Sequence, residues 1–210
     1  MTYDSIIFDM DGTLWDAVDS YAAIWNRTLA DCSVRRPPVT RDELISLMGK
    51  PLAEIAAILV PGLKGDELKT FTDRLRINDA AMLPGLGGKL YPGVRDTMER
   101  LMARGVRLFM LSNCGPQGIP VFLDYTGLGP FVTDYLSYGS TGHDKDVNIR
   151  TLVARYNLGS PLYVGDTVGD LLSTRRAGIP FAWASYGFGL DFNPADADIV
   201  LSSFSDLAKI

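Results

Sequence analysis

Apolar residues fall along this chain in two patterns, short continuous runs and longer stretches with helical spacing. Short runs rich in β-branched and aromatic residues, bounded by turn residues, predict buried strands. Such runs occur at residues 4–8, 106–111, 162–164 and 181–184. Helical stretches separate them, at residues 92–105, 147–156 and 170–177. Strands that alternate with helices predict an α/β fold, with a Rossmann-like parallel sheet covered by helices on both faces.

A purely helical region interrupts this alternation after residue 16. Its first apolar residues repeat at i, i+3, i+4 and i+7 and form one helix face, with Val18, Tyr21, Ala22, Trp25 and Leu29. Thr40 and Glu43 have the spacing of a capping box, which predicts a helix start there and an end near Gly49. Further helices are predicted at residues 52–60, with Pro51 in the first turn, and at 66–82.

The run Pro84-Gly85-Leu86-Gly87-Gly88 predicts the end of this helical region. No strand signal occurs between residues 17 and 82. We therefore expect an all-helical domain, residues 17–88, inserted into an α/β core made of residues 1–16 and 89–210. The predicted hinges are residues 14–16 and the glycine run.

The composition is that of a globular protein, with 47% apolar and 21% charged residues among 210. The net charge of −5 argues against a nucleic-acid partner, which would require a basic face. An anionic substrate stays compatible with this charge, because a metal ion and one lysine can reverse the sign locally. Since no apolar stretch approaches the roughly 20 residues of a membrane span, we expect no membrane partner.

Cys32 and Cys114 are the only cysteines, and their separation fits neither a CxxC pair nor a metal site. Reduced cysteines are typical of an intracellular protein. The first residues lack the basic region and the long apolar run of a signal peptide. We therefore expect a cytoplasmic protein.

Polar residues follow three of the predicted strands. Asp9 and Asp11 follow the first strand, Ser112 and Asn113 follow the second, and Asp166 and Asp170 follow a later one. In a parallel α/β sheet, ligands bind beyond the carboxyl ends of the strands, so these side chains are expected on one rim. Buried carboxylates cost several kcal/mol unless they are paired. Their oxygens are suitable ligands for a hard cation, which would explain why the charges are tolerated.

Four segments resemble, in this order, the motifs of the haloacid dehalogenase (HAD) superfamily. They are DMDGTLWD at residues 9–16, LSNCG at 111–115, the isolated Lys145 and GDTVGD at 165–170. The first and last of these are the specific signals, because each combines carboxylates and glycine at a fixed spacing. The resemblance covers essentially the whole chain, and it implies a HAD-like core with the helical region as a first-type cap domain.

The resemblance implies a role for each motif residue. Asp9 would be the nucleophile that forms an aspartyl-phosphate, and Asp11 the general acid and base. Ser112 and Lys145 would complete the catalytic set, since Lys145 neutralises the nucleophile and the transferred group. Gly12, Thr13 and Asn113 would bind the phosphoryl group.

The resemblance also implies a Mg²⁺ site formed by Asp9, the backbone carbonyl of Asp11, Asp166 and Asp170, the last as a ligand or as an outer-shell orienter. The physical reason is that an anionic carboxylate and an anionic phosphate repel each other. A divalent ion and a lysine remove that repulsion and stabilise the transition state.

Simpler interpretations remain open for several of these residues. Asp11-Gly12 after a strand is compatible with an ordinary turn, and Ser112-Asn113 could cap a following helix. Lys145 lies between Asp144 and Asp146, outside the Gly-Lys-Pro setting common in the family, and could be a solvated surface lysine. Tyr21, Trp25 and Lys50 are interpreted as structural residues of the helical domain.

The resemblance implies a magnesium-dependent phosphatase that hydrolyses a small phosphorylated metabolite, of the phosphoglycolate type or a sugar phosphate. Dehalogenases of the superfamily lack the second aspartate of the first motif, which is present here as Asp11. The alternatives are a phosphotransferase or mutase, a pyrophosphatase, or a non-catalytic binding protein that kept the fold. The expected partner is the small substrate alone, and the expected state is a monomer or a simple homodimer.

Overall fold

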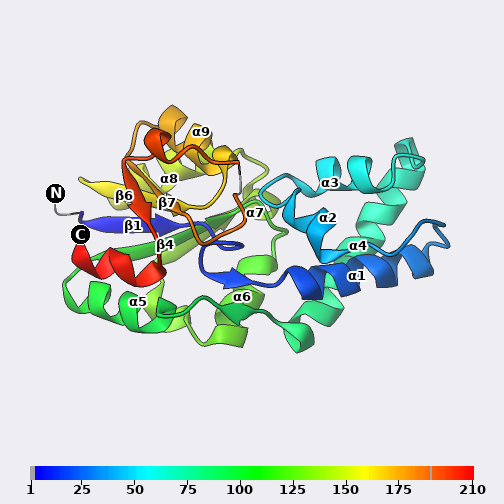
Figure 1. The fold of residues 1–210 in the computed structure, drawn as a ribbon, viewed down its shortest axis with the longest axis horizontal. Coiled ribbons are helices and arrows are strands. Elements are labelled where there is room, and N and C mark those ends of the chain that lie inside the picture. Colours follow the sequence, from blue (N-terminus) through cyan, green and yellow to red (C-terminus); the bar gives the residue numbers. More distant parts are fainter. Residues whose placement is uncertain (1–2, 190) are drawn as a thin grey trace.

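The core of the protein is a six-stranded parallel sheet (Figure 1), seen in a computed structural model that describes residues 3–189 and 191–210. The strand order is β5-β4-β1-β6-β7-β8, with β1 in the interior. The strands are β1 (Ser5–Phe8), β4 (Arg107–Ser112), β5 (Asp134–Ser137), β6 (Pro161–Gly165), β7 (Phe181–Ala184) and β8 (Ile199–Leu201). The predicted parallel sheet is confirmed, and the two edge strands β5 and β8 were not predicted.

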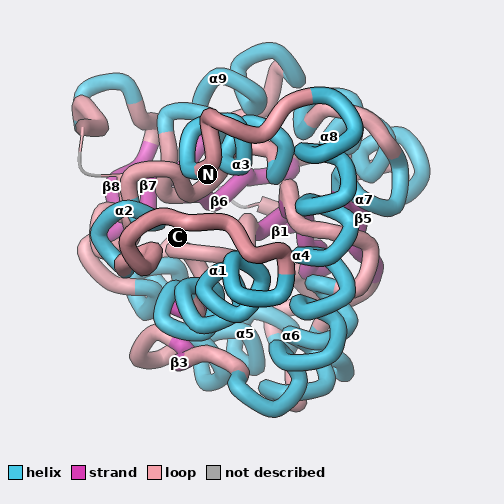
Figure 2. Tube along the Cα trace, turned by 90° about the vertical axis from the view of Figure 1, so that its right-hand side faces the viewer, coloured by secondary structure: helices cyan, strands magenta, loops and turns pink. Residues whose placement is uncertain are grey.

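Helices cover both faces of the sheet because successive strand residues point to opposite sides. Ile6 and Phe8 pack with α5 (Val94–Ala103), α6 (Gly118–Thr126) and the 3₁₀ helix η3 (Phe204–Lys209). Ile7 packs with α8 (Lys145–Tyr156) and α9 (Val168–Ala177) on the other face. Figure 2 shows the two layers on opposite sides of the strands.

Four helices form a separate group beyond the end of β1 (Figure 1), and we call them the helical block. They are α1 (Val18–Asp31), α2 (Arg41–Ile45), α3 (Leu52–Leu59) and α4 (Gly65–Leu86). The predicted capping box at Thr40 is present, because its hydroxyl accepts from the N–H of Glu43 while the Glu43 carboxylate accepts from the N–H of Thr40. The block contains no strand, as predicted.

Two predicted helix boundaries in this block are wrong. The helix that starts after Thr40 ends at Ile45 rather than near Gly49, and α4 continues through Pro84 to Leu86. Proline removes one helical hydrogen bond near the end of α4, but Leu83 beside it is buried and holds the last turn against the core. Gly87 follows the last helical residue and stops the helix, because its φ of 61° lies in the left-handed region.

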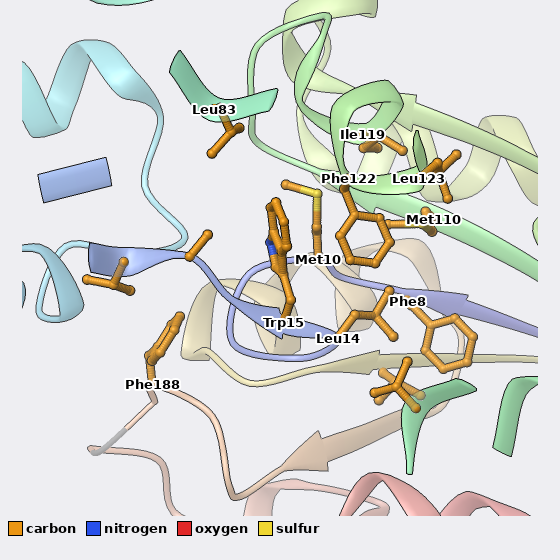
Figure 3. Packing of buried hydrophobic residues seen from close by; sticks show 14 of the residues in the cluster. Phe8, Met10, Leu14, Trp15, Leu83, Met110, Ile119, Phe122, Leu123 and Phe188 are labelled. Atoms are coloured by element: carbon orange, nitrogen blue, oxygen red, sulfur yellow. The ribbon is translucent and has the colours of Figure 1, made fainter. Parts of the chain in front are cut away.

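The two chain segments that join the block to the sheet run side by side. β2 (Trp15–Asp16) pairs antiparallel with β3 (Lys89–Leu90). Figure 3 shows Trp15 between Leu83 of α4 and Phe122 of α6, and the Trp15 and Phe122 rings meet edge to face with centroids 5.0 Å apart. One apolar cluster therefore continues from the sheet into the block.

Short elements complete the fold, namely α7 (Tyr138–Thr141) and the 3₁₀ helices η1 (Gly129–Phe131) and η2 (Pro194–Asp196). Within residues 3–189 and 191–210, no helix has the length and apolar character that crossing a membrane requires.

Candidate active site

Asp9 is the first residue after β1, in the interior of the sheet. Its N–H donates to the carbonyl of Val164 at 2.8 Å, which extends the pairing of β1 with β6 by one residue. The chain then turns sharply, and the N–H of Leu14 returns to the carbonyl of Met10 at 2.9 Å. Gly12 has a φ of 83° in this turn, and an added Cβ would lie 2.7 Å from the Phe188 ring and closer still to the Asp166 carboxylate. Only glycine fits this position.

Two donors hold the Asp11 carboxylate, and one of them comes from the helical block. Trp15 Nε1 and Tyr21 Oη donate to Asp11 Oδ1 at 2.9 and 3.0 Å. Burial raises the pKa of Asp11 to about 6, although these two hydrogen bonds oppose the rise. An acid with a pKa near neutrality can both deliver and accept a proton, which suits the predicted role.

Lys145 begins α8 and is 5% exposed. Its Nζ donates to Asp9 Oδ1 at 2.8 Å and to Asp170 Oδ1 at 2.6 Å. Burial alone would lower the pKa of Lys145, but the charges of Asp170 and Asp9 raise it well above its usual value. The structure therefore places this lysine between two carboxylates rather than on the surface.

Asp170 is fully occupied by protein partners. It is the third residue of α9, where its Oδ2 accepts from the N–H of Thr167 at 3.0 Å and the Thr167 hydroxyl accepts in return, as a capping box. Tyr163 Oη donates to Oδ1 at 3.2 Å. Burial alone would raise the pKa of Asp170, yet Lys145 and these hydrogen bonds hold it below its usual value. Asp170 is the carboxylate that carries the negative charge opposite Lys145.

Asp166 follows β6 and is fully buried. Its Oδ2 accepts from the N–H of Phe188 at 2.8 Å, and its Oδ1 accepts from the Thr13 hydroxyl at 3.3 Å. Burial raises the pKa of Asp166 well above its usual value, with further contributions from the charges of Asp170 and Asp9. Lys145 bonds Asp9 and Asp170 but forms no ion pair with Asp166, nor does any other cation within residues 3–189 and 191–210.

Asp9, Asp166 and Asp170 form one acidic cluster, with an oxygen from each within 4.8 Å of the others. Lys145 supplies one positive charge to these three carboxylates. The donor set is oxygen only, as hard divalent cations prefer, so the residues fit a hard divalent cation. The Asp11 side chain lies outside this cluster.

The second motif lies at the end of β4. Ser112 is buried, and its hydroxyl accepts from the N–H of Cys114 at 3.2 Å. Asn113 Nδ2 donates to the carbonyl of Gly49 at 2.8 Å, which links the sheet to the loop between α2 and α3. Asn113 thus contacts the helical block here.

A cavity of about 140 Å³ lies between the sheet and the helical block. On the sheet side its lining includes Asp9, Asp11, Ser112, Asn113 and Lys145. Four predicted residues do not line this cavity, namely Gly12, Thr13, Asp166 and Asp170. Behind it, Thr13 is bonded to Asp166, and Asp170 is bonded to Lys145. The predicted residues therefore meet at one place, some at the surface of the cavity and others supporting it.

Several residues at this site were not predicted. Tyr21 was interpreted as structural, and Trp15 and Tyr163 carried no chemical signal. Gly187, before Phe188, has no room for a Cβ because Asp166 and the Gly12 carbonyl lie against it. The glycines on both sides of Phe188 were the available signal, since paired glycines often mark a close approach of the backbone.

The family model described as haloacid dehalogenase-like hydrolase matches residues 6–184. The chain belongs to the haloacid dehalogenase-like hydrolase family. The predicted resemblance is confirmed, and the chain is a hydrolase of this family.

Full-length relatives of this HAD-like hydrolase carry phosphatase names. This chain is 28% identical to a phosphoglycolate phosphatase of Synechococcus elongatus, over 98% of this chain and 95% of the relative. This chain is also 24% identical to the pyrophosphatase PpaX of Oceanobacillus iheyensis, over 100% of this chain and 97% of the relative. Among solved structures, a predicted phosphoglycolate phosphatase from Haemophilus somnus superposes with a TM-score of 0.88 at 24% identity, covering 100% of this chain and 98% of that one. That likeness shows the fold.

Proposed function

We propose that this protein is a magnesium-dependent phosphatase that hydrolyses a small phosphorylated metabolite through an aspartyl-phosphate on Asp9. The observation that carries the proposal is the arrangement around Asp9, which faces the cavity with Lys145 bonded to it and Asp11 beside it. The names of the relatives support a substrate of the phosphoglycolate type or, as the second candidate, pyrophosphate. A sugar phosphate stays a prediction from the sequence motifs.

In the first step, an Asp9 oxygen attacks phosphorus as the bond to the leaving oxygen breaks. Asp11 gives its proton to that leaving oxygen. Water then attacks phosphorus and gives a proton to Asp11, the bond from phosphorus to Asp9 breaks, and phosphate leaves. Both residues return to their starting states, so the cycle balances.

The supporting residues keep charge and geometry in place during these steps. Lys145 reduces the repulsion between Asp9 and the phosphoryl group, and Ser112 is near enough to the cavity to donate to a phosphoryl oxygen. Asp9, Asp166 and the backbone carbonyl of Asp11 would hold Mg²⁺, with Asp170 as a further ligand or as an outer-shell orienter. The ion, when bound, neutralises negative charge at the phosphoryl group.

We further propose that residues 17–88 act as a cap over the cavity, with residues 1–16 and 89–210 as the catalytic core. The contacts of Tyr21 with Asp11 and of Asn113 with Gly49 support a closed arrangement that excludes water. A cytoplasmic location and a monomer or simple homodimer stay predictions.

The test is phosphate release from a panel of phosphomonoesters and pyrophosphate, with and without Mg²⁺. We expect Mg²⁺-dependent release by the wild type and a loss of at least about 1,000-fold in Asp9→Asn, because an amide cannot act as the nucleophile. Asp66→Asn, at the exposed start of α4, is the control for the same change of charge. Equal activity of wild type and Asp9→Asn would exclude the proposal.

A further inference from the structure

The helical block supplies the wall of the cavity opposite Asp9 and Asp11. This wall is largely apolar, and its members include Ile24, Trp25, Leu44, Ile55, Leu75 and Leu83. The apolar side chains of this wall can pack against the carbon skeleton of a leaving group, but they offer it no hydrogen bond. The few polar residues of the wall therefore decide which functional group a substrate can carry.

Asp79 of α4 is the acidic residue of this wall. It is half-buried, and no hydrogen bond or ion pair joins its carboxylate to another residue of the described chain (3–189 and 191–210). Burial raises the pKa of Asp79 to about 6. Its charge also raises the pKa of both Asp11 and Tyr21, so it lies near the predicted general acid.

The cationic residues of the wall lie toward solvent. Arg76 Nη1 is bonded to Asp73 Oδ1 at 2.9 Å, and the Arg76 side chain is 52% exposed. Lys50 is also exposed. Arg76 and Asp79 are three residues apart on one helix but form no ion pair, so the Asp79 carboxylate remains available to a ligand.

We propose that Asp79 selects the substrate, by accepting a hydrogen bond from a hydroxyl or ammonium group on a short leaving group. The inference rests on the proposed phosphatase function. Within that function it sets aside the phosphoglycolate type and favours a short ester that carries a hydroxyl or ammonium group. A carboxylate at the same place would meet the like charge of Asp79 in a poorly hydrated cavity, so phosphorylated hydroxy acids should be disfavoured.

The volume of the cavity also indicates the size of leaving group that fits inside it. Its volume of about 140 Å³ is close to that of a protein cavity that holds benzene, about 150 Å³. The phosphoryl group must occupy the part beside Asp9 and Lys145. The remaining space suits a leaving group of about two to three carbon atoms.

Four esters of nearly equal size separate the possibilities. They share a phosphate on a short chain and differ at the other end: 2-hydroxyethyl phosphate, O-phosphoethanolamine, propyl phosphate and 2-phosphoglycolate. At pH 7.5 with Mg²⁺, we expect the better of the hydroxyl and ammonium esters to exceed propyl phosphate by about 10- to 100-fold in kcat/KM, the range for a hydrogen bond to a charged group. We expect 2-phosphoglycolate to be no better than propyl phosphate.

Variants of Asp79 identify the group responsible. Asp79→Leu should remove the preference for the hydroxyl or ammonium ester over propyl phosphate. Asp79→Asn should remove a preference for the ammonium ester but keep part of a preference for the hydroxyl ester, since an amide oxygen still accepts a hydrogen bond. Asp66→Asn, which makes the same charge change at the exposed start of α4, should keep the wild-type ratios.

The outcomes distinguish the two proposals. Mg²⁺-dependent hydrolysis in which propyl phosphate or 2-phosphoglycolate is preferred, or in which the Asp79 variants keep the wild-type ratios, overturns the inference and leaves the phosphatase proposal intact. No Mg²⁺-dependent hydrolysis of any phosphomonoester, p-nitrophenyl phosphate included, overturns both. Circular dichroism of each variant ensures that only folded proteins are compared.

Discussion

At the residue scale, Lys145 is the group on which the buried charges depend. It bonds both Asp9 and Asp170, and the three side chains are 5%, 7% and 0% exposed. Removing one member of such a buried cluster leaves charges without a partner, whereas removing charges of both signs is much less costly.

We therefore expect Lys145→Met to lower the free energy of unfolding by about 3–5 kcal/mol at pH 7.5 without Mg²⁺. Urea denaturation measures this change. The double variant Lys145→Met/Asp170→Asn should recover part of the loss, because it also removes the unpaired carboxylate. A loss below about 1 kcal/mol in the single variant would mean that the cluster is hydrated and weakly coupled.

The carboxylates of this site could be predicted from the sequence because each follows a buried strand within a few residues. Lys145 was harder to assign, since it is 136 residues from Asp9 and 25 from Asp170 and does not directly follow a predicted strand. Tyr21 has the spacing of an apolar helix face, and its contact with Asp11 depends on how α1 meets the sheet. That angle is tertiary information, which a one-dimensional pattern does not contain.

At the element scale, α4 carries Asp79 into the cavity at a cost in stability. The carboxyl group has a pKa of about 6 in the folded chain against an ordinary value of 3.8. The folded state therefore binds more protons than the unfolded state between about pH 4 and pH 6. The contribution of Asp79 to stability consequently falls as the pH rises through that window, and it stays low above pH 6.

Asp79→Asn should for this reason stabilise the metal-free and substrate-free protein by about 1–2 kcal/mol at pH 7.5, and the gain should vanish near pH 4. Urea denaturation of wild type and variant at both pH values tests the sign. Asp66→Asn should show no comparable pH-dependent gain. A constant difference at the two pH values would mean that Asp79 is ionised equally in the folded and unfolded chains.

Elements with a strong apolar signal were predicted, and weaker ones were not. The edge strand β8 has three residues, and β5 begins with half-buried Asp134 and exposed Tyr135, so neither shows the continuous apolar run of a central strand. Pro84 misled the prediction of the end of α4, because the local cost of proline is outweighed by the burial of Leu83. Tertiary packing decided each of these cases.

At the scale of the whole molecule, the alternation of strands and helices was sufficient to predict the parallel sheet, and the helical spacing predicted helices between residues 17 and 82. The paired ribbon β2–β3 was not predicted, since its strands of two residues each are brought together only when the chain leaves and re-enters the sheet. This geometry brings the helical block to the rim that carries the acidic cluster. The folded state therefore assembles a site whose charges are far apart in the unfolded chain.

Because that site exists only in the folded state, binding of Mg²⁺ should stabilise the whole molecule. At a free concentration of about 100 times Kd the gain is about 2.7 kcal/mol. For a chain of this length that gain corresponds to a rise in Tm of roughly 5–10 °C. Differential scanning calorimetry with increasing Mg²⁺ measures the shift without any substrate.

Asp166→Asn should lose most of this Mg²⁺-dependent rise. Asp166 is the cluster member that Lys145 does not bond, and an amide supplies one neutral oxygen in place of a charged carboxylate. The variant itself should be more stable than the metal-free wild type, since burial makes the ionised Asp166 unfavourable. These opposite effects distinguish loss of the metal site from loss of folding. An equal Mg²⁺-dependent rise in wild type, Asp166→Asn and the control Asp66→Asn would place the ion elsewhere on the surface.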